Sequence, residues 1–195
     1  FASGPIMSPQ EYLDQKADPT AGDRREGLAR ILEGGLKIAG AIVLSMLVPL
    51  SSLWAANWAI GRWPSPLLWL GLFLSGVWLF LNFSGYSDIY IGLARLAGVR
   101  APENFDRPYA ASDLAAFWQR WHISLGNWLR TFVYTPLSLS LLGGAPSRAL
   151  AVSMIAPVVT MAICGAWHML SAGYLLWGLM HGAGLALQAI WGRLG

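Results

Sequence analysis

Three uncharged runs divide the chain, covering residues 38–61, 63–87 and 149–192. An α-helix rises about 1.5 Å per residue, so roughly 20 apolar residues cross the hydrocarbon core of a bilayer. The first two runs are each long enough for one crossing, and the third is long enough for two. The pattern therefore predicts four membrane spans, at about 38–60, 67–83, 150–170 and 173–191.

Two polar segments flank the first pair of predicted spans. Residues 1–37 hold eleven charged residues, five of them Lys or Arg, and should start irregularly and continue as an interfacial helix over 22–37. Residues 95–130 carry five Arg, whereas the turns around Arg62 and Arg148 carry one each. Because Lys and Arg are enriched in cytoplasmic loops, both polar segments are predicted to be cytoplasmic.

The stretch 131–147 is uncharged but contains four residues that break or end helices. These are Pro136, Gly143, Gly144 and Pro146. A clean crossing would need an uninterrupted apolar helix. The composition therefore predicts a re-entrant segment or a tilted half-span at this point.

Composition sets the class of protein. The 195 residues are 55% hydrophobic and 12% charged, about half the charge of a soluble domain. A soluble enzyme and a nucleic-acid partner are therefore excluded, and we expect a polytopic all-α membrane protein in contact with lipid. The net charge of +3 reports membrane topology, and the single Cys164 excludes a disulfide framework. With Phe1 first and no signal peptide, residues 1–195 are expected to form one incomplete membrane domain that lacks its upstream spans.

Polar residues cluster on one side of the predicted span 150–170. Ser153, Thr160, Cys164 and His168 fall within one arc of about 80°, which also contains Pro157. Two hypotheses remain open. Either this face borders a protein interior or aqueous cavity with His168 at its end, or the hydroxyls bond their own backbone and His168 is a packed interfacial histidine.

Residues 112–132 show the pattern of an amphipathic helix at the cytoplasmic interface. Ser112 is the expected N-cap, with Asp113 in the first turn. The apolar side covers an arc of about 120° and comprises Leu114, Phe117, Trp118, Trp121, Leu125, Trp128, Leu129 and Phe132. His122 lies at the edge between this side and the polar one. It either meets a cavity and water or belongs to a surface anchor in which the histidine has no role.

Two further polar positions lie inside predicted spans. His181 and Gln188 are about 20° apart on one helix, flanked by Gly178 and Gly184, and favour a structural hydrogen bond across a close helix contact. Asp88 ends a polar run after the second span, and either pairs with Arg95 or another Arg or lines a cavity.

Metal binding has little support in the sequence. Cys164 and His168 are four residues apart and supply only two ligands, and no spacing typical of a metal site occurs. A haem held by two histidines of separate spans remains an alternative. We therefore predict no metal site.

Several motifs, taken together, resemble those of bacterial membrane-bound O-acyltransferases, most nearly the alginate O-acetyltransferase branch. The resemblance covers about 4–184. Its motifs are GPI at 4–6, FSGYSD at 83–88, PENF at 102–105, PY at 108–109, FWQRWHISL at 117–125, WLRTFVYTPL at 128–137, CGAWH at 164–168 and LLWGLMHG at 175–182. Departures from the family pattern are Ser8 in place of Arg, Thr131 in place of Asp, Met169 and Leu170 in place of Gly-Ala, and a changed stretch 137–142.

The resemblance implies a ring of membrane helices, of which this chain would form part, around a thin funnelled centre. An acyl group, expected to be acetyl, would arrive on a cytoplasmic thioester and pass to a hydroxyl of an extracytoplasmic polysaccharide. The family's catalytic histidines map onto His168, as general base, and His122. Residues expected to contact substrate are Asp88, Asn104, Trp118, Arg120, Trp121 and Trp167.

The resemblance also implies co-substrates and partners. The donor would be acyl-coenzyme A or an acyl-carrier protein, with no tightly bound cofactor, in a multi-pass protein of the bacterial inner membrane. Arg107, Arg120 and Arg130 would either hold the donor's phosphates or only signal topology. An extracytoplasmic acyltransferase is an expected partner. A non-catalytic scaffold and a transporter fragment remain alternatives.

Overall fold

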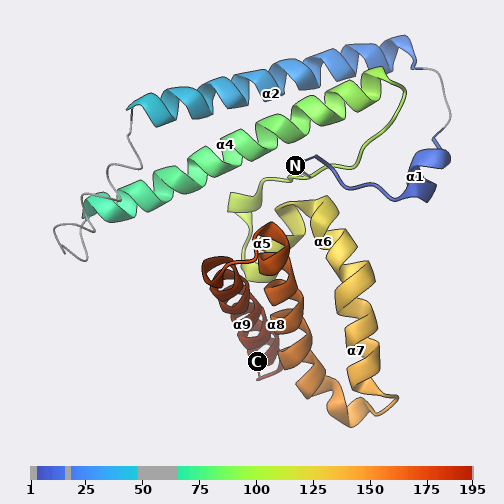
Figure 1. The fold of residues 1–195 in the computed structure, drawn as a ribbon, viewed down its shortest axis with the longest axis vertical. Coiled ribbons are helices and arrows are strands. Elements are labelled where there is room, and N and C mark those ends of the chain that lie inside the picture. The colour runs from blue at the N-terminus through green and yellow to red at the C-terminus, as the bar shows by residue number, and fades with distance from the viewer. Residues whose placement is uncertain (1–3, 16–18, 48–65, 195) are drawn as a thin grey trace. The chain divides into compact units, whose positions relative to one another are not determined.

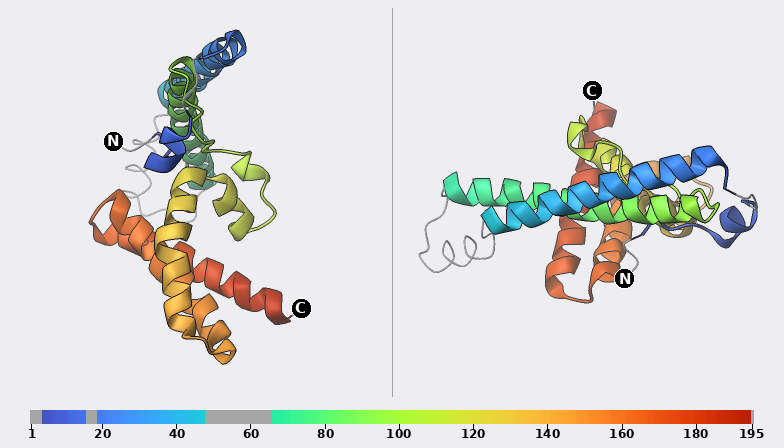
Figure 2. Two further views of the ribbon diagram at one scale, coloured as in Figure 1. Left: turned by 90° about the vertical axis from the view of Figure 1, so that its right-hand side faces the viewer. Right: turned by 90° about the horizontal axis from the view of Figure 1, so that it is seen from above.

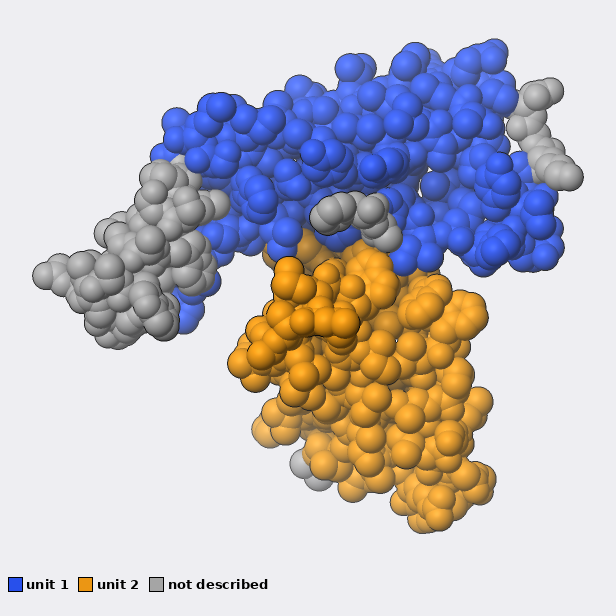
Figure 3. Space-filling model, in the orientation of Figure 1, with its two compact units in different colours: residues 1–104 blue, residues 105–195 orange. Residues whose placement is uncertain are grey.

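The computed structural model describes residues 4–15, 19–47 and 66–194, and within these ranges the chain forms helices and connecting loops (Figure 1). The predicted all-α class is confirmed for the described residues. The chain divides into two compact units, Phe1–Asn104 and Phe105–Gly195 (Figure 3). Each unit is described below by itself.

The first unit is built on two long antiparallel helices. A short helix α1 (Pro9–Leu13), closed by a capping box between Ser8 and Glu11, precedes them. The long helices are α2 (Ala21–Leu47) and α4 (Pro66–Leu96), which lie side by side in every view (Figures 1 and 2).

Glycines bring these two helices into close contact. A Cβ atom on Gly34 would lie 2.5 Å from the carbonyl oxygen of Gly85, and one on Gly92 would lie 2.6 Å from that of Gly27. Neither helix has room for a side chain at these positions. Small residues of this kind let helix backbones approach each other in membrane proteins.

The first two predicted spans agree with these helices only in part. The interfacial helix predicted over 22–37 and the start of the first span form one continuous helix up to Leu47. The rest of that predicted span, 48–60, lies outside the described residues. The second span continues as α4 through the polar run before Asp88 and ends at Leu96.

The second unit contains a series of short helices followed by two long ones. After a 3₁₀ turn (Pro108–Ala110) come α5 (Leu114–Arg120), α6 (Ile123–Leu129), a π-helical segment (Arg130–Tyr134) and α7 (Thr135–Leu142). A second 3₁₀ turn (Pro146–Arg148) leads into α8 (Ala149–His168), and α9 (Ala172–Leu194) follows. Glycines join α8 to α9 as well, because a Cβ on Gly165 would collide with the Tyr174 carbonyl oxygen and one on Gly178 with that of Met161.

The single amphipathic helix predicted over 112–132 is wrong, because the helix breaks between Arg120 and Ile123. Phe105 and Trp121 form an antiparallel β-bridge, and the carbonyl of Arg120 accepts a hydrogen bond from the N–H of Asp106 at 3.1 Å. This pairing with an upstream loop takes the backbone out of helical geometry, with φ of 48° at His122. The N-cap is also one residue later than predicted, since Asp113 accepts from the N–H of Ala116.

The predicted half-span 131–147 is helical over most of its length. Helix α7 ends at Leu142, where Gly143 has φ of 53° and Gly144 has φ of 73°. Glycine adopts this left-handed conformation readily and commonly terminates helices. The segment is therefore short, as predicted, while its re-entrant placement stays a prediction.

Helices α8 and α9 have nearly the bounds predicted for the third and fourth spans. Among the described residues, two helical stretches are long and apolar enough to cross a membrane, Trp69–Leu96 and Pro146–His168. They correspond to the second and third predicted spans. The ring of transmembrane helices stays a prediction.

Candidate active site

All three histidines of the chain lie in the second unit, in one cluster of rings. Adjacent members of the cluster have ring centroids 6.4 Å apart for His122 and Trp167, 4.9 Å for Trp167 and His168, 5.8 Å for His168 and Trp177, and 4.9 Å for Trp177 and His181. Rings from the junction of α5 and α6, from α8 and from α9 therefore form one series in which each ring contacts the next. We call this set the histidine–tryptophan cluster.

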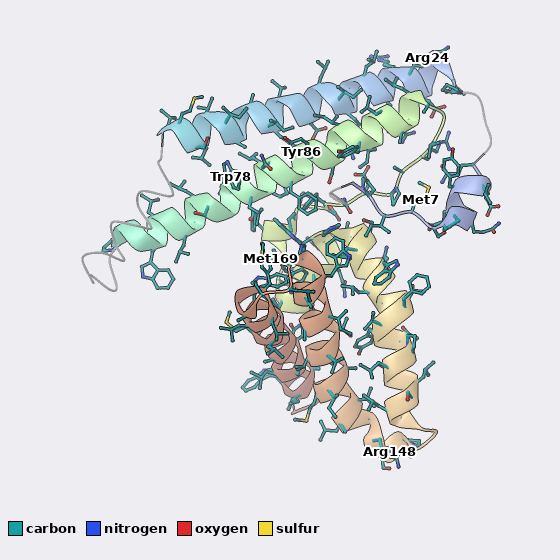
Figure 4. The ribbon with its side chains drawn as sticks, in the orientation of Figure 1. Met7, Arg24, Trp78, Tyr86, Arg148 and Met169 are labelled. Atoms are coloured by element: carbon teal, nitrogen blue, oxygen red, sulfur yellow. The ribbon has the colours of Figure 1, made fainter. Side chains whose placement is uncertain are left out.

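His168 lies at the end of α8, where the helix stops. The next residue, Met169 (labelled in Figure 4), has an extended backbone with φ of −164°. The His168 side chain is exposed, and its imidazole contacts three aromatic rings. Trp167 and Trp177 meet it edge to face, and Tyr174 stacks on it at 5.9 Å with an interplanar angle of 29°.

Tyr174 and Trp177 were not among the predicted site residues. Both belong to α9, and with His181 they follow one another at spacings of three and four residues. Residues spaced in this way lie on one face of a helix. That spacing was available in the sequence and marks the face of α9 that meets His168.

His122 is the buried member of the cluster, with 3% of its surface exposed. Its left-handed backbone is uncommon for a residue other than glycine, asparagine or aspartate. Burial lowers the pKa of His122 to about 4, with the imidazole of His168 as a smaller cause. At neutral pH the His122 side chain is therefore uncharged.

On the polar face of α8, the structure shows what the two hydroxyls do, while the role of His168 stays a prediction. The Thr160 hydroxyl donates to the Ala156 carbonyl at 2.7 Å, and the Ser153 hydroxyl donates to the Leu150 carbonyl at 2.8 Å. Both hydroxyls therefore bond their own helix, as the structural alternative predicted. Cys164 is buried on the same face, with 2% exposed.

Trp118, a predicted substrate contact, packs against α9. Its ring centroid lies 5.2 Å from that of His181 and 5.7 Å from that of Trp177, both in edge-to-face geometry. Its indole N–H is buried, and none of the described residues accepts a hydrogen bond from it. Trp118 therefore belongs to the histidine–tryptophan cluster.

The structural hydrogen bond predicted across a close helix contact is confirmed for Gln188, whereas His181 meets α5 through the ring of Trp118. The Gln188 amide donates to the Asp113 carboxylate at 2.8 Å and accepts from the Ala115 N–H at 3.0 Å. Gln188 thus caps the start of α5, where backbone N–H groups lack helical partners. Its role is structural, as predicted, and the helix across the contact is α5.

Trp121 and Arg120 lie beside His122 in sequence. Trp121 packs among Phe105, Phe117 and Tyr109 at 5.0, 5.6 and 6.2 Å. The Arg120 side chain is half-buried and makes no ion pair with any described residue. The hypothesis that it holds a phosphate therefore stays a prediction.

Asp88 and Asn104 belong to the first unit, where other residues bind them. Lys37 Nζ lies 2.5 Å from Asp88 Oδ2, and Arg30 Nη1 lies 3.1 Å from Oδ1. The alternative that Asp88 pairs with Arg95 is wrong, because Arg95 pairs with Asp23 and Glu26 instead. The alternative of another Arg is confirmed by Arg30.

Asn104 is fully buried and donates to the Ser87 hydroxyl at 3.1 Å. Its neighbour Glu103 forms an ion pair with Arg30. The predicted site residues are thus divided. Two lie in the first unit, and the structure gathers three of the others, Trp118, His122 and Trp167, with His168 in the histidine–tryptophan cluster.

The described residues offer no group of three or more His, Cys, Asp or Glu side chains that could hold a metal ion. The chemistry available in the cluster is that of imidazole rings and an indole donor. An uncharged imidazole accepts a proton near neutral pH. An exposed imidazole, such as that of His168, is therefore a candidate for general-base chemistry.

Comparison with known proteins gives this cluster a context. The model of the MBOAT, membrane-bound O-acyltransferase family, matches residues 42–194. The probable alginate O-acetylase AlgI of Pseudomonas aeruginosa is 32% identical over 188 residues, which are 95% of this chain and 34% of that protein. The teichoic acid D-alanyltransferase of Streptococcus thermophilus is 30% identical over 204 residues, with coverage of 99% and 48%.

A third relative matches a shorter part of the chain. The peptidoglycan O-acetyltransferase of Helicobacter pylori is 36% identical over 110 residues, which are 56% of this chain and 20% of that protein. The chain spans between about a third and about half the length of the two relatives that match nearly all of it.

Proposed function

The chain belongs to the membrane-bound O-acyltransferase family, and from that premise we propose that the protein passes an acetyl group from a cytoplasmic thioester to a hydroxyl of an extracytoplasmic polysaccharide. The names of the alginate and peptidoglycan relatives support acetyl as the group and a polysaccharide as the acceptor. The observation that carries the proposal is the exposed imidazole of His168 at the end of α8, held among aromatic rings.

His168 acts as the general base. Its free ring nitrogen takes the proton from the acceptor hydroxyl while the hydroxyl oxygen attacks the thioester carbonyl carbon. The C–S bond of the resulting tetrahedral intermediate then breaks, and the proton passes from His168 to the departing thiolate. The products are an ester and a free thiol, and His168 returns to its uncharged form.

His122 assists as an uncharged group. Because the pKa of His122 is held at about 4, the ring does not carry a positive charge to the donor at neutral pH. It can still donate one hydrogen bond and accept another. We assign it to holding the thioester or passing a proton at the cytoplasmic mouth.

The reaction proceeds without a covalent enzyme intermediate. Cys164 precedes His168 by one helical turn, but its thiol is buried within α8 and α9 with 2% exposed. A nucleophilic thiol needs access and a group that stabilises its thiolate. Neither is present at Cys164 among the described residues.

The donor is acyl-coenzyme A or an acyl-carrier protein, used as a co-substrate rather than a bound cofactor. Arg107, Arg120 and Arg130 are the candidates for its phosphates, because guanidinium groups pair well with phosphate. Trp118, Trp121 and Trp167 would line the path of the acyl group. The substrate contacts expected of Asp88 and Asn104 stay a prediction, because both side chains are buried and bonded within the first unit. The protein would act in the inner membrane with an extracytoplasmic acyltransferase as partner.

The decisive experiment replaces His168 with alanine in the full-length protein. Cells of a bacterial host without its own enzyme receive radiolabelled acetate, and alkali-labile label is counted in delipidated envelope and secreted polysaccharide. We expect His168→Ala to lower the rate by at least about 100-fold, the order of magnitude of general-base catalysis. The matched control is Ser153→Ala on the same helix, whose hydroxyl bonds only its own backbone.

A non-catalytic scaffold would give the opposite result. If label enters the polysaccharide equally well with His168→Ala, at unchanged abundance in the membrane, the role of His168 is refuted and the scaffold hypothesis gains. Loss of label with both His168→Ala and Ser153→Ala would instead point to damage of α8 and count against the assignment.

A further inference from the structure

His181 has no part in the reaction proposed above, yet it is a full member of the histidine–tryptophan cluster. Its ring lies 4.9 Å from that of Trp177 on its own helix and 5.2 Å from that of Trp118 on α5. Trp177 in turn lies 5.8 Å from His168. The indole of Trp177 therefore contacts both histidines.

His168 depends on α9 for its orientation. It is the last residue of α8, and the chain leaves helical geometry at Met169, so no further turn of its own helix packs against the imidazole. The contacts on that side come from Tyr174 and Trp177. Together with Trp167 of α8, these two rings therefore limit where the His168 nitrogen can lie.

The backbones of α8 and α9 are locked at this level. Gly165, one turn before His168, is in contact with the Tyr174 carbonyl, and Gly178 is in contact with that of Met161. The two helices cannot shift to make up for a lost side chain between them without separating these contacts. A ring removed beside Trp177 would leave a void that the indole could turn into.

We propose that His181 is a positioning residue for His168, acting through the indole of Trp177. The inference rests on the proposed function, because it assigns His168 the proton transfer. A direct proton path from His181 to His168 is excluded through this contact, since the indole nitrogen of Trp177 is a donor only. What His181 contributes is a flat ring that holds Trp177 in place.

The size of the expected effect follows from the geometry of acyl transfer. A displacement of about 1 Å at a reacting group costs on the order of 100-fold in rate. A loosened Trp177 still has Trp118 on one side. We therefore expect His181→Ala to slow acetyl transfer by about tenfold.

The test measures His181→Ala, His181→Phe, Trp177→Leu and the double variant of Trp177→Leu with His181→Ala in the labelled-acetate assay. Each is made in the full-length protein and normalised to its abundance in the membrane. His181→Phe keeps a flat ring without a titratable nitrogen, and we expect it to retain at least about a third of the wild-type rate. Trp177→Leu removes the intermediary. In that background His181→Ala should cause no further loss, because the coupling runs through the missing indole.

Gln188→Ala is the matched control for a purely structural effect. Like His181, Gln188 connects α9 to α5, but it does so through hydrogen bonds to Asp113 and Ala115 rather than through ring contacts. We expect this variant to keep the wild-type rate per folded molecule. An equal loss with Gln188→Ala would show that α5 docking, rather than Trp177, is responsible, and would overturn the inference.

Two other outcomes would also overturn it. One is an unchanged rate with His181→Ala, and the other is failure of His181→Phe to restore activity. The assay includes His168→Ala, which separates the two proposals. If His168→Ala is inactive while His181→Ala is fully active, only the inference fails, whereas an active His168→Ala refutes the proposed function itself.

Discussion

Two antiparallel helix pairs, α2–α4 in the first unit and α8–α9 in the second, both pack closely through glycines. They differ in the polar side chains that they hold. In both pairs glycines leave no room for a Cβ between the helices. Between α2 and α4 the polar groups are charged, and Asp88 is bound by Arg30 and Lys37. The segment 149–192 contains no Asp, Glu, Lys or Arg, and the cluster on α8 and α9 is built from imidazole and aromatic rings.

Under the proposed function, the difference distinguishes a side chain that stabilises the fold from one that is open to a substrate. Asp88 is 5% exposed and has two cationic partners, so its charge is neutralised within the unit. His168 is exposed, and the rings of Trp167, Tyr174 and Trp177 contact its imidazole. A side chain whose bonding capacity is already used stabilises the structure, while one that keeps a free nitrogen can act on a substrate.

The largest effect should come from filling the glycine contacts. Gly34→Ala places a Cβ against the Gly85 carbonyl, and Gly178→Ala places one against that of Met161, so each should destabilise the protein by more than about 3 kcal/mol. Thermal denaturation of the purified protein in detergent measures this. A similar fall in melting temperature for Gly34→Ala and Gly178→Ala would show that both helix pairs depend on their glycine contacts.

The chain offers a matched control for each substitution. A Cβ atom on Gly35 of α2 or on Gly173 of α9 would have no neighbouring atom within 4 Å. Alanine there should stabilise the helix by about 0.5–1 kcal/mol, because it restricts the unfolded chain. Equal melting temperatures for Gly34→Ala and Gly35→Ala would refute the close contact.

The next effect tests the charged pair. Asp88→Ala removes the buried carboxylate shared by Arg30 and Lys37, which keep only the more exposed Glu33 and Glu103 as partners. The loss should cost about 3 kcal/mol of stability, the low end of the range for breaking a buried ion pair. The control is Glu26→Ala, which removes a more exposed partner of Arg95 and should cost less than about 1 kcal/mol. A melting temperature for Asp88→Ala as high as that of the control would contradict a stabilising role of the buried carboxylate.

The smallest effect concerns pH and belongs to the second unit. The pKa of His122 is about 4 in the folded protein and about 6.5 when unfolded, so protonation favours the unfolded chain. Stability is therefore lost as pH falls from about 6.5 towards 4, by about 2 kcal/mol between pH 7 and pH 5. Melting curves at the two pH values measure the loss.

His122→Asn sharpens this test, because asparagine tolerates the left-handed backbone and does not titrate in this range. The variant should lose most of the stability difference between pH 7 and pH 5. If the difference is the same with and without His122, another group is responsible for it.

The sequence predicted α8 and α9 well because charged residues are absent from nearly all of their length. The absence of charged residues over 149–192 placed α8 and α9 within a few residues of their observed bounds. The same reasoning failed at His122, because the apolar pattern continues smoothly across the break between α5 and α6. Backbone pairing with Phe105 and Asp106 causes that break, and side-chain periodicity carries no signal for such a contact.

Only part of the candidate site was predicted, because contacts between helices leave little signal in the sequence. Periodicity and family motifs singled out His122 and His168, but for Asp88 the sequence named Arg95 and left Arg30 unspecified as another Arg, because which face of α2 meets α4 depends on the glycine contacts. Trp177 was not predicted, because an aromatic ring within an apolar span does not stand out from its neighbours as a polar residue does. Its place beside His168 follows from the packing of α8 on α9.

The glycine contacts between α2 and α4 also restrict motion. The contacts Gly27–Gly92 and Gly34–Gly85 lie two turns apart on each helix, so both must be engaged at once. Sliding one helix along the other by a turn would bring glycines against side chains and separate Asp88 from its partners. The contacts therefore oppose sliding of α2 along α4. The two helices should move together as one rigid body whenever the protein changes conformation.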